Sequence, residues 1–507
     1  MIKPSAAVLA SLLLAGCAVG PDFQRPAAPS VRSYTATPVE TTAASAGVQG
    51  GESQHFERGG DMPAQWWQLF HSQPLDALIK QALASNPDLK AAQAALLSAR
   101  ETALAGRGAY YPSVGVGVSA NRQQDPPGAL APVPSSNASL YNLLTAQVSV
   151  SYMPDVFGLN RRTVESLEAQ AQAARYEMIA TDIALGANVA VTAIQVASLR
   201  EQLKATQELA GINAHVLSIM RYQLAKGYIG RLDVAAQETQ LAQVNASLPA
   251  LRTQLAQQQH RLAVLAGRFP SEGAAVTFDL AGLQLPQELP LSLPSTLVAQ
   301  RPDVLQAQAN LHAASAQVGV AIANRLPNLT LSADAGSTAL AIGQLFKSGT
   351  GFWGLGAELA APVFEGGSLK HQERAAKAAY TQAAEQYRST VLAAFEDVAD
   401  TLTALQQDAQ ALQAATAADK AARVTLDLSQ RQWKDGYAGY LAVLGAEQAA
   451  LQARIGLVQA QASRYADTVA LFQALGGGWW HRADLAQDGD APVTAADTTS
   501  TRGDHEH

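Results

Sequence analysis

The side chains best suited to covalent or metal chemistry, one cysteine and nine histidines, are thinly spread along this chain of 507 residues. No His-x-x-x-His pair occurs, and the histidines within stretches of helical composition stand singly: His215, His260, His312 and His371. A metal centre or a catalytic site needs several such groups held together. We therefore expect these histidines to lie on helix surfaces or in helix seams, and their pattern predicts neither an enzyme nor a metal site. Cys17 remains as the residue whose sequence context indicates a covalent modification.

Cys17 stands at the end of an export signal. Lys3 precedes an apolar run from Ala6 to Ala15, which is too short to cross a membrane, and small residues follow it. Leu14-Ala15-Gly16-Cys17 resembles the lipobox of bacterial lipoproteins, whose cysteine is acylated and becomes the first mature residue. The next residue is Ala18, not the aspartate that typically retains such lipoproteins in the inner membrane. We therefore expect residues 1–16 to be a signal peptide and Cys17 to carry a covalent lipid in the outer membrane; a chance cysteine after a signal peptide is the alternative.

The composition indicates a folded protein without a nucleic-acid partner. The formal net charge is −7, whereas proteins that bind DNA or RNA carry basic surfaces that neutralise phosphates. Hydrophobic residues make up 48% of the chain, enough for a large core. Residues 17–65, rich in Pro, Ala, Ser, Thr and Gly, are expected to form a linker from the lipid anchor, and the polar residues 481–507 a disordered tail.

Between linker and tail the chain repeats itself once. The correspondence keeps its order through both halves, and its clearest pairs are Asn86-Pro87-Asp88-Leu89 with Arg301-Pro302-Asp303-Val304, Tyr111-Pro112-Ser113 with Leu326-Pro327-Asn328, and Lys226-Gly227-Tyr228-Ile229-Gly230 with Asp435-Gly436-Tyr437-Ala438-Gly439. We therefore expect repeat 1 to cover residues 66–280 and repeat 2 residues 281–480. Each should read as helix, strand, outer loop, strand, long helix, tight turn and long helix.

The long helices account for most of each repeat. The segments 163–225 and 368–434 contain no proline and little glycine, and Ala, Gln, Leu and Glu dominate them. Apolar side chains recur at heptad spacing in the first segment, at Val164, Leu167, Ala171, Ala174 and Met178. The turns at 226–230 and 435–439 would then reverse the chain into a second helix. A plain coiled-coil stalk explains this seam equally well.

Four short segments alternate apolar and polar residues with period two, at about 113–120, 144–152, 328–336 and 352–360. Such alternation is typical of half-buried strands and is also the signature of outer-membrane barrel strands, whose polar face lines a wet lumen. On that interpretation Asp334 and Glu358 face the lumen. The alternative is a soluble sheet packed on one face, but an export signal with a lipobox favours the barrel.

Four strands cannot close a barrel, because single-chain barrels begin at eight strands and an open edge cannot face lipid. We therefore expect several copies of the chain to pool their strands. Each strand pair is followed by a helical hairpin whose turn lies far from the sheet, so the barrel would continue as a helical tube. The predicted protein is mainly α with a small β part, and the predicted shape is a conduit.

At this point the motifs together resemble the TolC-type outer membrane factors, and within them the NodT-like lipoprotein branch. The resemblance covers nearly the whole chain, and the residues that carry it are Gly16-Cys17-Ala18-Val19-Gly20-Pro21-Asp22-Phe23, Arg301-Pro302-Asp303, Phe364-Glu365-Gly366-Gly367 and Ala474-Leu475-Gly476-Gly477-Gly478-Trp479. It implies a homotrimer with a twelve-stranded barrel, four strands per chain, and an α-helical tunnel through the periplasm. It also implies docking to a periplasmic adaptor protein and an inner-membrane transporter.

The function implied by this resemblance is that of the exit duct of a tripartite efflux pump for small molecules or drugs. A type I protein-secretion duct is the runner-up, and a lipid-anchored periplasmic coiled-coil protein is the rival from another class. No cofactor is expected beyond the lipid on Cys17. The exported compound cannot be named from an exit duct, because specificity resides in the transporter.

The resemblance further implies a tunnel that is closed at its periplasmic tip, which this chain reaches at its two turns. The residues expected at the tip are Gly227, Tyr228, Gly230, Gly436, Tyr437 and Gly439. Tyr228 and Tyr437 could contact the adaptor or could pack between helix ends. Both interpretations remain open at the level of sequence.

Asp233 matches an aspartate of the tip, and Trp433 stands where some family members place a tyrosine that bonds to it. An indole N–H could still donate to that carboxylate. The alternative for Asp233 is a solvated residue in the first turn of a helix, where the helix dipole favours an acid. Ala442 and Gly445 occupy two further positions that are acidic in the family, so an acidic constriction is in doubt here.

Overall fold

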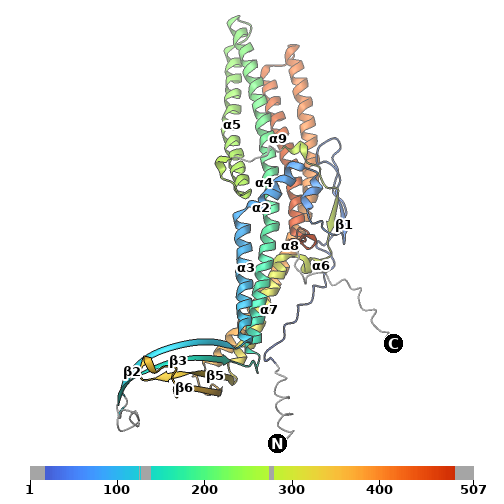
Figure 1. Cartoon of the computed structure of the whole chain (residues 1–507). Coiled ribbons are helices and arrows are strands. Elements are labelled where there is room, and N and C mark those ends of the chain that lie inside the picture. Colours follow the sequence, from blue (N-terminus) through green and yellow to red (C-terminus); the bar gives the residue numbers. More distant parts are fainter. Residues whose placement is uncertain (1–17, 125, 127–138, 273–278, 486–507) are drawn as a thin grey trace, which may run out of the picture. The chain divides into compact units, whose positions relative to one another are not determined.

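The computed structural model describes residues 18–124, 126, 139–272 and 279–485 (Figure 1). The expected signal peptide, Cys17 and residues 486–507 of the expected tail lie outside the described residues. The chain divides into two compact units. The strand unit comprises residues up to Pro26 with Ala95–Arg175 and Gln306–Arg388, and the tip unit comprises Ala27–Ala94, Tyr176–Leu305 and residues from Ser389 onwards.

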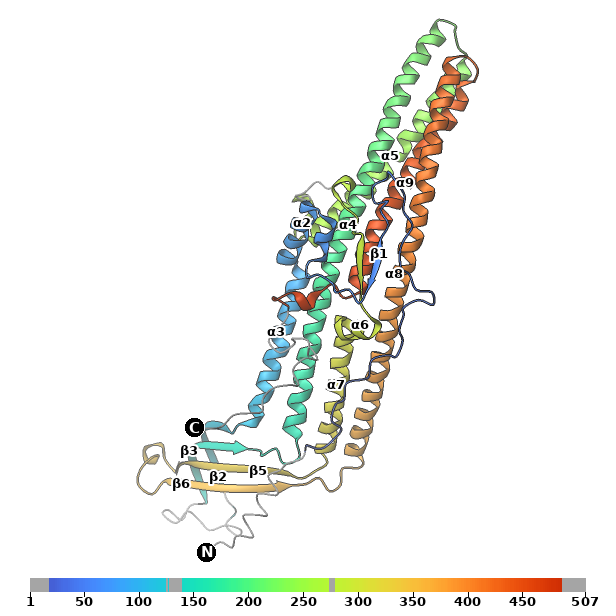
Figure 2. The same cartoon turned by 90° about the vertical axis from the view of Figure 1, so that its right-hand side faces the viewer.

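The strand unit contains a four-stranded antiparallel sheet. Its strands are β2 (Ser113–Gln124), β3 (Leu140–Tyr152), β5 (Asn328–Ala339) and β6 (Gly351–Ala360), in the order β2-β3-β5-β6 (Figure 2). β2 runs four residues beyond the predicted 113–120, because Asn121 to Gln124 pair with β3 although they do not alternate in polarity. β2 and β6 each have one neighbour in the described sheet, so each has an outer edge of unpaired backbone groups.

The helices show the internal repeat in their lengths. α4 (Leu159–Ala225) and α8 (Ser368–Lys434) each have 67 residues, and α5 (Arg231–Leu265) and α9 (Tyr440–Ala474) each have 35. The two tip turns therefore fall at 226–230 and 435–439. The prediction of a mainly α protein with a small β part is confirmed. By length and composition α4 could cross a membrane, but 67% of its most apolar window is buried inside the protein.

Shorter helices connect these elements. They are η1 (Trp66–Phe70), α2 (Gln73–Ser85), α3 (Pro87–Arg107), η2 (Gly108–Tyr110), η3 (Pro270–Glu272), η4 (Leu280–Gly282), α6 (Pro294–Gln300), α7 (Pro302–Ala323), η5 (Ile342–Gln344) and η6 (Trp479–His481). In the tip unit an aromatic core joins η1 to α9. Trp66 packs on Phe472 with ring centroids 5.6 Å apart, and Phe70 lies 6.3 Å from Tyr465.

Asn86 and Arg301, which correspond in the repeat, fasten equivalent helix ends. The side-chain oxygen of Asn86 accepts from the N–H groups of Asp88 and Leu89 and so caps α3, while its amide donates to the carbonyl of Leu265 at 3.0 Å. Arg301 donates to the carbonyl of Ala474 at 3.0 Å. Each motif thus ties the last residue of α5 or α9 to the start of a repeat.

The segment predicted to be a linker is not free in the tip unit. β1 (His55–Arg58) pairs in parallel with β4 (Glu288–Leu291). The fully buried side chain of Gln54 donates to the carbonyl of Pro286 at 3.0 Å and to Thr468 at 3.1 Å. These hydrogen bonds fix a segment whose sequence has no hydrophobic periodicity. The expectation of a free linker over residues 17–65 is therefore wrong for residues 54–58.

The start of the expected disordered tail, residues 481–507, also needs correction. α9 ends at Ala474, and the glycines at 476–478 all take positive φ, so they stop the helix. Beyond them Trp479 donates to the carbonyl of Gln300 at 2.7 Å, and Arg482 forms an ion pair with the buried Asp182. Residues 481–485 are therefore fixed to the tip unit and are not a disordered tail.

Candidate functional site

The register of the sheet collects small and polar side chains on one face. Ser149 lies opposite Asp334, which lies opposite Gly354, and Glu358 lies opposite Thr330. Because side chains alternate along each strand, these residues share one face of the sheet. Asp334 and Glu358 therefore lie on the same polar face, as the sequence pattern predicts.

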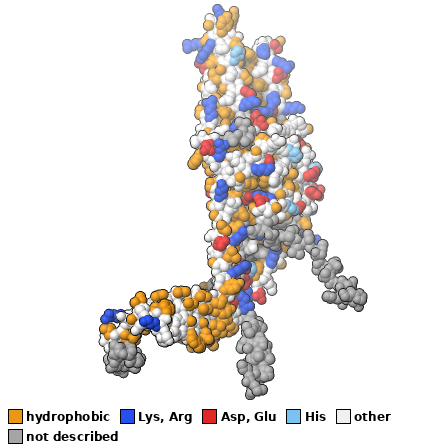
Figure 3. Space-filling model, in the orientation of Figure 1, with side chains coloured by type: hydrophobic (Ala, Val, Ile, Leu, Met, Phe, Trp, Pro, Cys, Tyr) orange, Lys and Arg blue, Asp and Glu red, His pale blue; other side chains and the backbone are white. Residues whose placement is uncertain are grey.

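The other face of the sheet is apolar and uncovered. Val116, Val148, Ala335 and Trp353 line up across the four strands. Val116 is 80% exposed and Trp353 76% exposed, and Figure 3 shows hydrophobic side chains gathered over the strands. A soluble sheet would bury this face against a core, but no described element does so. Such a continuous apolar surface needs lipid or another protein against it.

The two tip turns have the same backbone geometry. Gly227 and Gly436 both have φ of +79°, a conformation that glycine adopts without cost. The N–H of Tyr228 donates to the carbonyl of Gln223, and that of Tyr437 to Gln432, which closes each helix in the same way. Gly230 and Gly439 then precede the first residues of α5 and α9.

Tyr228 and Tyr437 point away from the helix ends. Their side chains are 78% and 86% exposed. Packing between helix ends, one of the two interpretations of these tyrosines, is therefore not what this chain shows. Both side chains are accessible to another molecule at the turns.

Asp233 and Trp433 do not contact each other in the described chain. The Asp233 carboxylate accepts a hydrogen bond from the N–H of Gly230 at 3.3 Å, as an acid in the first turn of α5. The Trp433 ring packs on Tyr440, with centroids 5.0 Å apart. The suggested indole–carboxylate contact is therefore absent, because an apolar cluster at the tip holds the indole.

That apolar cluster, the tip core, joins the two helical hairpins. Its buried members are Leu217 and Met220 of α4, Val234 of α5, and Tyr440, Val443 and Leu444 of α9. Ala442 and Gly445 of α9 are exposed and uncharged, so neither position places an acidic side chain at the tip of the described chain. The tip core does not follow from the pattern of the two turns; its sequence signal is the run of apolar residues directly after Gly439.

Two carboxyl groups meet between α8 and α9. Burial, together with a hydrogen bond and charge repulsion from Asp467, raises the pKa of Asp408 to about 7, while the positive charge of Arg464 opposes this shift. The Arg464 side chain is buried and donates to Thr42 at 2.9 Å. Asp408 therefore lies beside a second carboxyl group in the tip unit, and it holds its proton more tightly than an ordinary aspartate does.

The residues that follow Cys17 are fixed to the strand unit. Asp22 pairs with Arg162 at 2.6 Å, Phe23 stacks on His312 at 4.3 Å, and His312 contacts Glu165 at 2.9 Å. A side chain at Gly158 would collide with Ala18. His312 is thus a packed helix residue. Residues 18–23 lie against the strand unit, and Ala18 lies beside the connection between β3 and α4.

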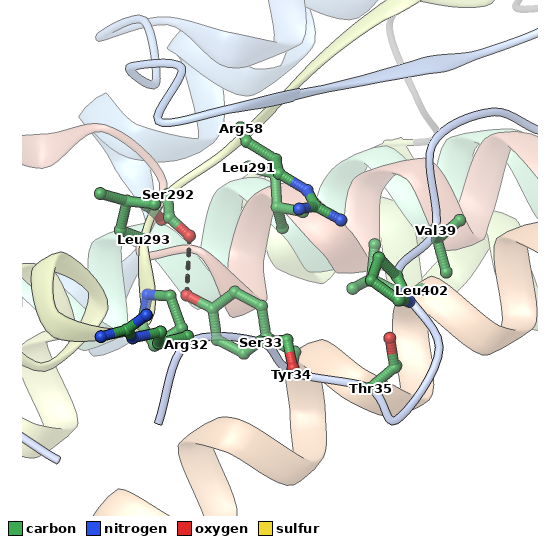
Figure 4. A pocket seen from close by; sticks show the side chains of 12 residues that line it. Arg32, Ser33, Tyr34, Thr35, Val39, Arg58, Leu291, Ser292, Leu293 and Leu402 are labelled. Atoms are coloured by element: carbon green, nitrogen blue, oxygen red, sulfur yellow. Dashed lines mark hydrogen bonds between the residues drawn. The ribbon is translucent and has the colours of Figure 1, made fainter. Parts of the chain in front are cut away.

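A shallow pocket lies where the N-terminal segment crosses the tip unit (Figure 4). Val39, Leu291 and Leu402 line it, and the Tyr34 hydroxyl donates to the carbonyl of Ser292 at 2.8 Å. Burial raises the pKa of Tyr34.

Among the described residues no three His, Cys, Asp or Glu side chains lie close enough to hold a metal ion. The pocket around Tyr34 is a space left where the N-terminal segment packs on the tip unit, and we assign it no ligand.

The chain combines long paired helices with a small sheet that has one bare apolar face and one polar face. This combination is typical of outer-membrane channel subunits that extend into the periplasm. The chain belongs to the outer membrane efflux protein family, whose model matches residues 78–268 and 293–477. These two matches correspond to the two repeats.

Relatives and a solved structure agree with this membership. The pyoverdine export outer membrane protein OpmQ of Pseudomonas putida strain KT2440 is 33% identical over 446 residues, 87% of this chain and 94% of that protein. The probable outer membrane lipoprotein SilC of Salmonella typhimurium is 26% identical, over 92% and 97%. The structure of the outer-membrane channel OprN matches with a TM-score of 0.79 and 27% identity, over 91% of this chain and all of that one. The chain is thus an outer-membrane efflux channel protein.

Proposed function

We propose that three copies of this chain close their strands into one twelve-stranded barrel in the outer membrane, and that their helices continue it as a periplasmic tunnel. The observation that carries the proposal is the sheet: four strands, two unpaired edges and a bare apolar face. In lipid every backbone polar group must be paired, so the edges of one copy need the edges of the next. The apolar face then meets lipid, and Asp334 and Glu358 face the water-filled lumen.

The lipid on Cys17 would be a second anchor for the same assembly. Residues 18–23 are fixed to the strand unit, and so the anchor would leave the protein beside the connection that follows β3. This arrangement supports a lipid anchor in the same membrane as the strands. No cofactor other than this lipid takes part.

The assembly acts as a passive exit duct and not as an enzyme. The energy and the choice of cargo come from an inner-membrane transporter, joined to the duct by a periplasmic adaptor that contacts the exposed tip residues Tyr228 and Tyr437. The export of pyoverdine, a small molecule, by the relative OpmQ favours small-molecule efflux over type I protein secretion.

The barrel can be tested with single cysteines, since Cys17 is the one native cysteine and its thiol would be occupied by lipid. Val116→Cys and Gly117→Cys place a thiol on adjacent positions of β2 that face opposite sides. A side chain at Gly117 meets no neighbour within 4 Å, so the strand tolerates it. A membrane-impermeant maleimide should label Gly117→Cys in outer-membrane vesicles and leave Val116→Cys unlabelled.

Both variants should label fully after denaturation in detergent, which serves as the control for intrinsic reactivity. Equal labelling of the two positions in intact membranes would contradict a lipid-facing apolar surface. Val116 would then face water and not lipid, and the coiled-coil alternative would be favoured.

A further inference from the structure

A buried chain of hydrogen bonds crosses the tip core. Gln237 of α5 is fully buried, and its side-chain amide donates to both the backbone and the side-chain oxygen of Asn213 in α4, at 2.8 Å each. The hydroxyl of Tyr440, the first residue of α9, donates to the side-chain oxygen of Gln237 at 3.1 Å. Asn213 is also fully buried. Three helices from two hairpins are thus joined by neutral polar groups in an apolar setting.

Glu447 completes this set, which we call the tip network. It lies on α9 seven residues after Tyr440, is 3% exposed, and accepts a hydrogen bond from Asn213. Its second carboxyl oxygen is buried without a hydrogen-bond partner. Burial raises the pKa of Glu447, and no cation contributes to the shift. The site therefore suits a neutral carboxylic acid better than a carboxylate.

The hydrogen bond between Tyr440 and Gln237 exists only while the two hairpins are together. The side chain of Gln237, which belongs to α5, forms hydrogen bonds to α4 and to α9. The hydrogen bond of the Tyr440 hydroxyl runs from α9 to α5. Moving α9 away from α5 would leave the Gln237 oxygen without this donor. Buried polar groups without partners are costly, whereas apolar residues of the tip core could slide and repack. The polar bonds therefore define one relative position of the two hairpins.

We propose that the tip network, Asn213, Gln237, Tyr440 and Glu447, is a latch that holds the periplasmic tip of the duct in its closed position. Its four residues lie within about four helical turns of the hairpin turns. Near these turns Ala442 and Gly445 carry no charge, and Trp433 packs on Tyr440 and not on Asp233. In this chain a neutral buried network thus does what exposed acidic contacts cannot. The inference rests on the proposed channel function.

The test is a double-mutant cycle read by single-channel recording on the lipidated, full-length protein. Tyr440→Phe removes one hydroxyl and keeps the ring in the tip core. Its open probability should rise about tenfold, equivalent to about 1.4 kcal/mol between closed and open tips. Gln237→Leu should have a similar or larger effect, and the double variant should add less than the sum, since both changes remove the same bond.

The matched controls are Tyr222→Phe and Gln243→Leu, which make the same chemical changes at exposed positions of α4 and α5. They should leave the open probability unchanged. Oligomer mass and thermal midpoint of each variant separate gating from folding, because a residue that merely supported the core would lower the midpoint without opening the channel.

The outcomes separate this inference from the function on which it rests. A wild-type protein that conducts in small steps, with Tyr440→Phe and Gln237→Leu indistinguishable from their controls, would overturn the latch and leave the duct intact. Strictly additive effects would overturn the pairing of Tyr440 with Gln237. A wild-type protein with no conductance would overturn the channel function itself.

Discussion

Arg301→Ala should lower the free energy of unfolding of the tip unit by about 1–3 kcal/mol, the usual cost of leaving buried hydrogen-bond acceptors without a donor, because water can still solvate the partly exposed carboxylates of Asp303 and Asp397. The Arg301 guanidinium is 11% exposed and holds four groups at once: the carbonyls of Ala394 and Ala474 and the carboxylates of Asp303 and Asp397. Burial opposes the charge of Arg301, but the hydrogen bonds that it donates to the two aspartates, together with their negative charges, raise its pKa above the ordinary value. Alanine would leave the end of α9 without this cap.

Thermal unfolding of the helices, followed by circular dichroism, measures this effect. Arg252→Ala, at an exposed position of α5, is the matched control and should change the stability by no more than about 0.5 kcal/mol. Equal midpoints for the two variants would show that Arg301 is dispensable for joining repeat 2 to its own last helix.

The second large effect is on pH dependence, through Asp408 and Asp467. The pKa of Asp408 is about 7 in the folded chain against an ordinary value of 3.8, so the folded state keeps a proton that the unfolded chain has released. Stability should therefore fall as the pH rises from about 4 to 7 and change little above that. Between pH 5.5 and 8 the full shift corresponds to a loss of roughly 2 kcal/mol, and because Asp408 is only half buried we expect solvent screening to reduce this loss to roughly 1 kcal/mol.

Asp408→Asn, which cannot ionise and can still hydrogen-bond to Asp467, should remove this slope and stabilise the tip unit at pH 8. Asp400→Asn, at an exposed position of the same helix, should keep the slope of the parent protein. If Asp408→Asn and Asp400→Asn have the same midpoint at pH 8, the pKa of Asp408 is not raised by its surroundings in the folded chain.

Local patterns predicted the elements of this fold well. Proline-free, alanine-rich segments predicted α4 to end at Ala225 and α8 to span Ser368–Lys434, and the structure has these bounds. The Gly-Tyr-x-Gly turns follow from glycines at positive φ, and the two faces of the sheet follow from alternation in single strands. Each of these features depends on residues within one or two turns of each other.

Contacts between distant parts of the chain were not predictable in the same way. Tyr440 and Gln237 are 203 positions apart, and Gln54 and Thr468 are 414 apart. Nothing local marks a glutamine as buried, so the tip network and the packed N-terminal segment were both missed. Trp433 was assigned a partner through the resemblance alone, and in this chain Tyr440 offers its ring a better contact than Asp233 does.

The central claim is that several copies of this chain form a mostly closed duct through the outer membrane. Single-channel conductance of the lipidated protein in a planar bilayer, with the oligomer mass of the same sample, tests it most directly. We predict a trimer that conducts in small, defined steps. A monomer or dimer without conductance would contradict the claim and leave a lipid-anchored periplasmic coiled-coil protein as the better account.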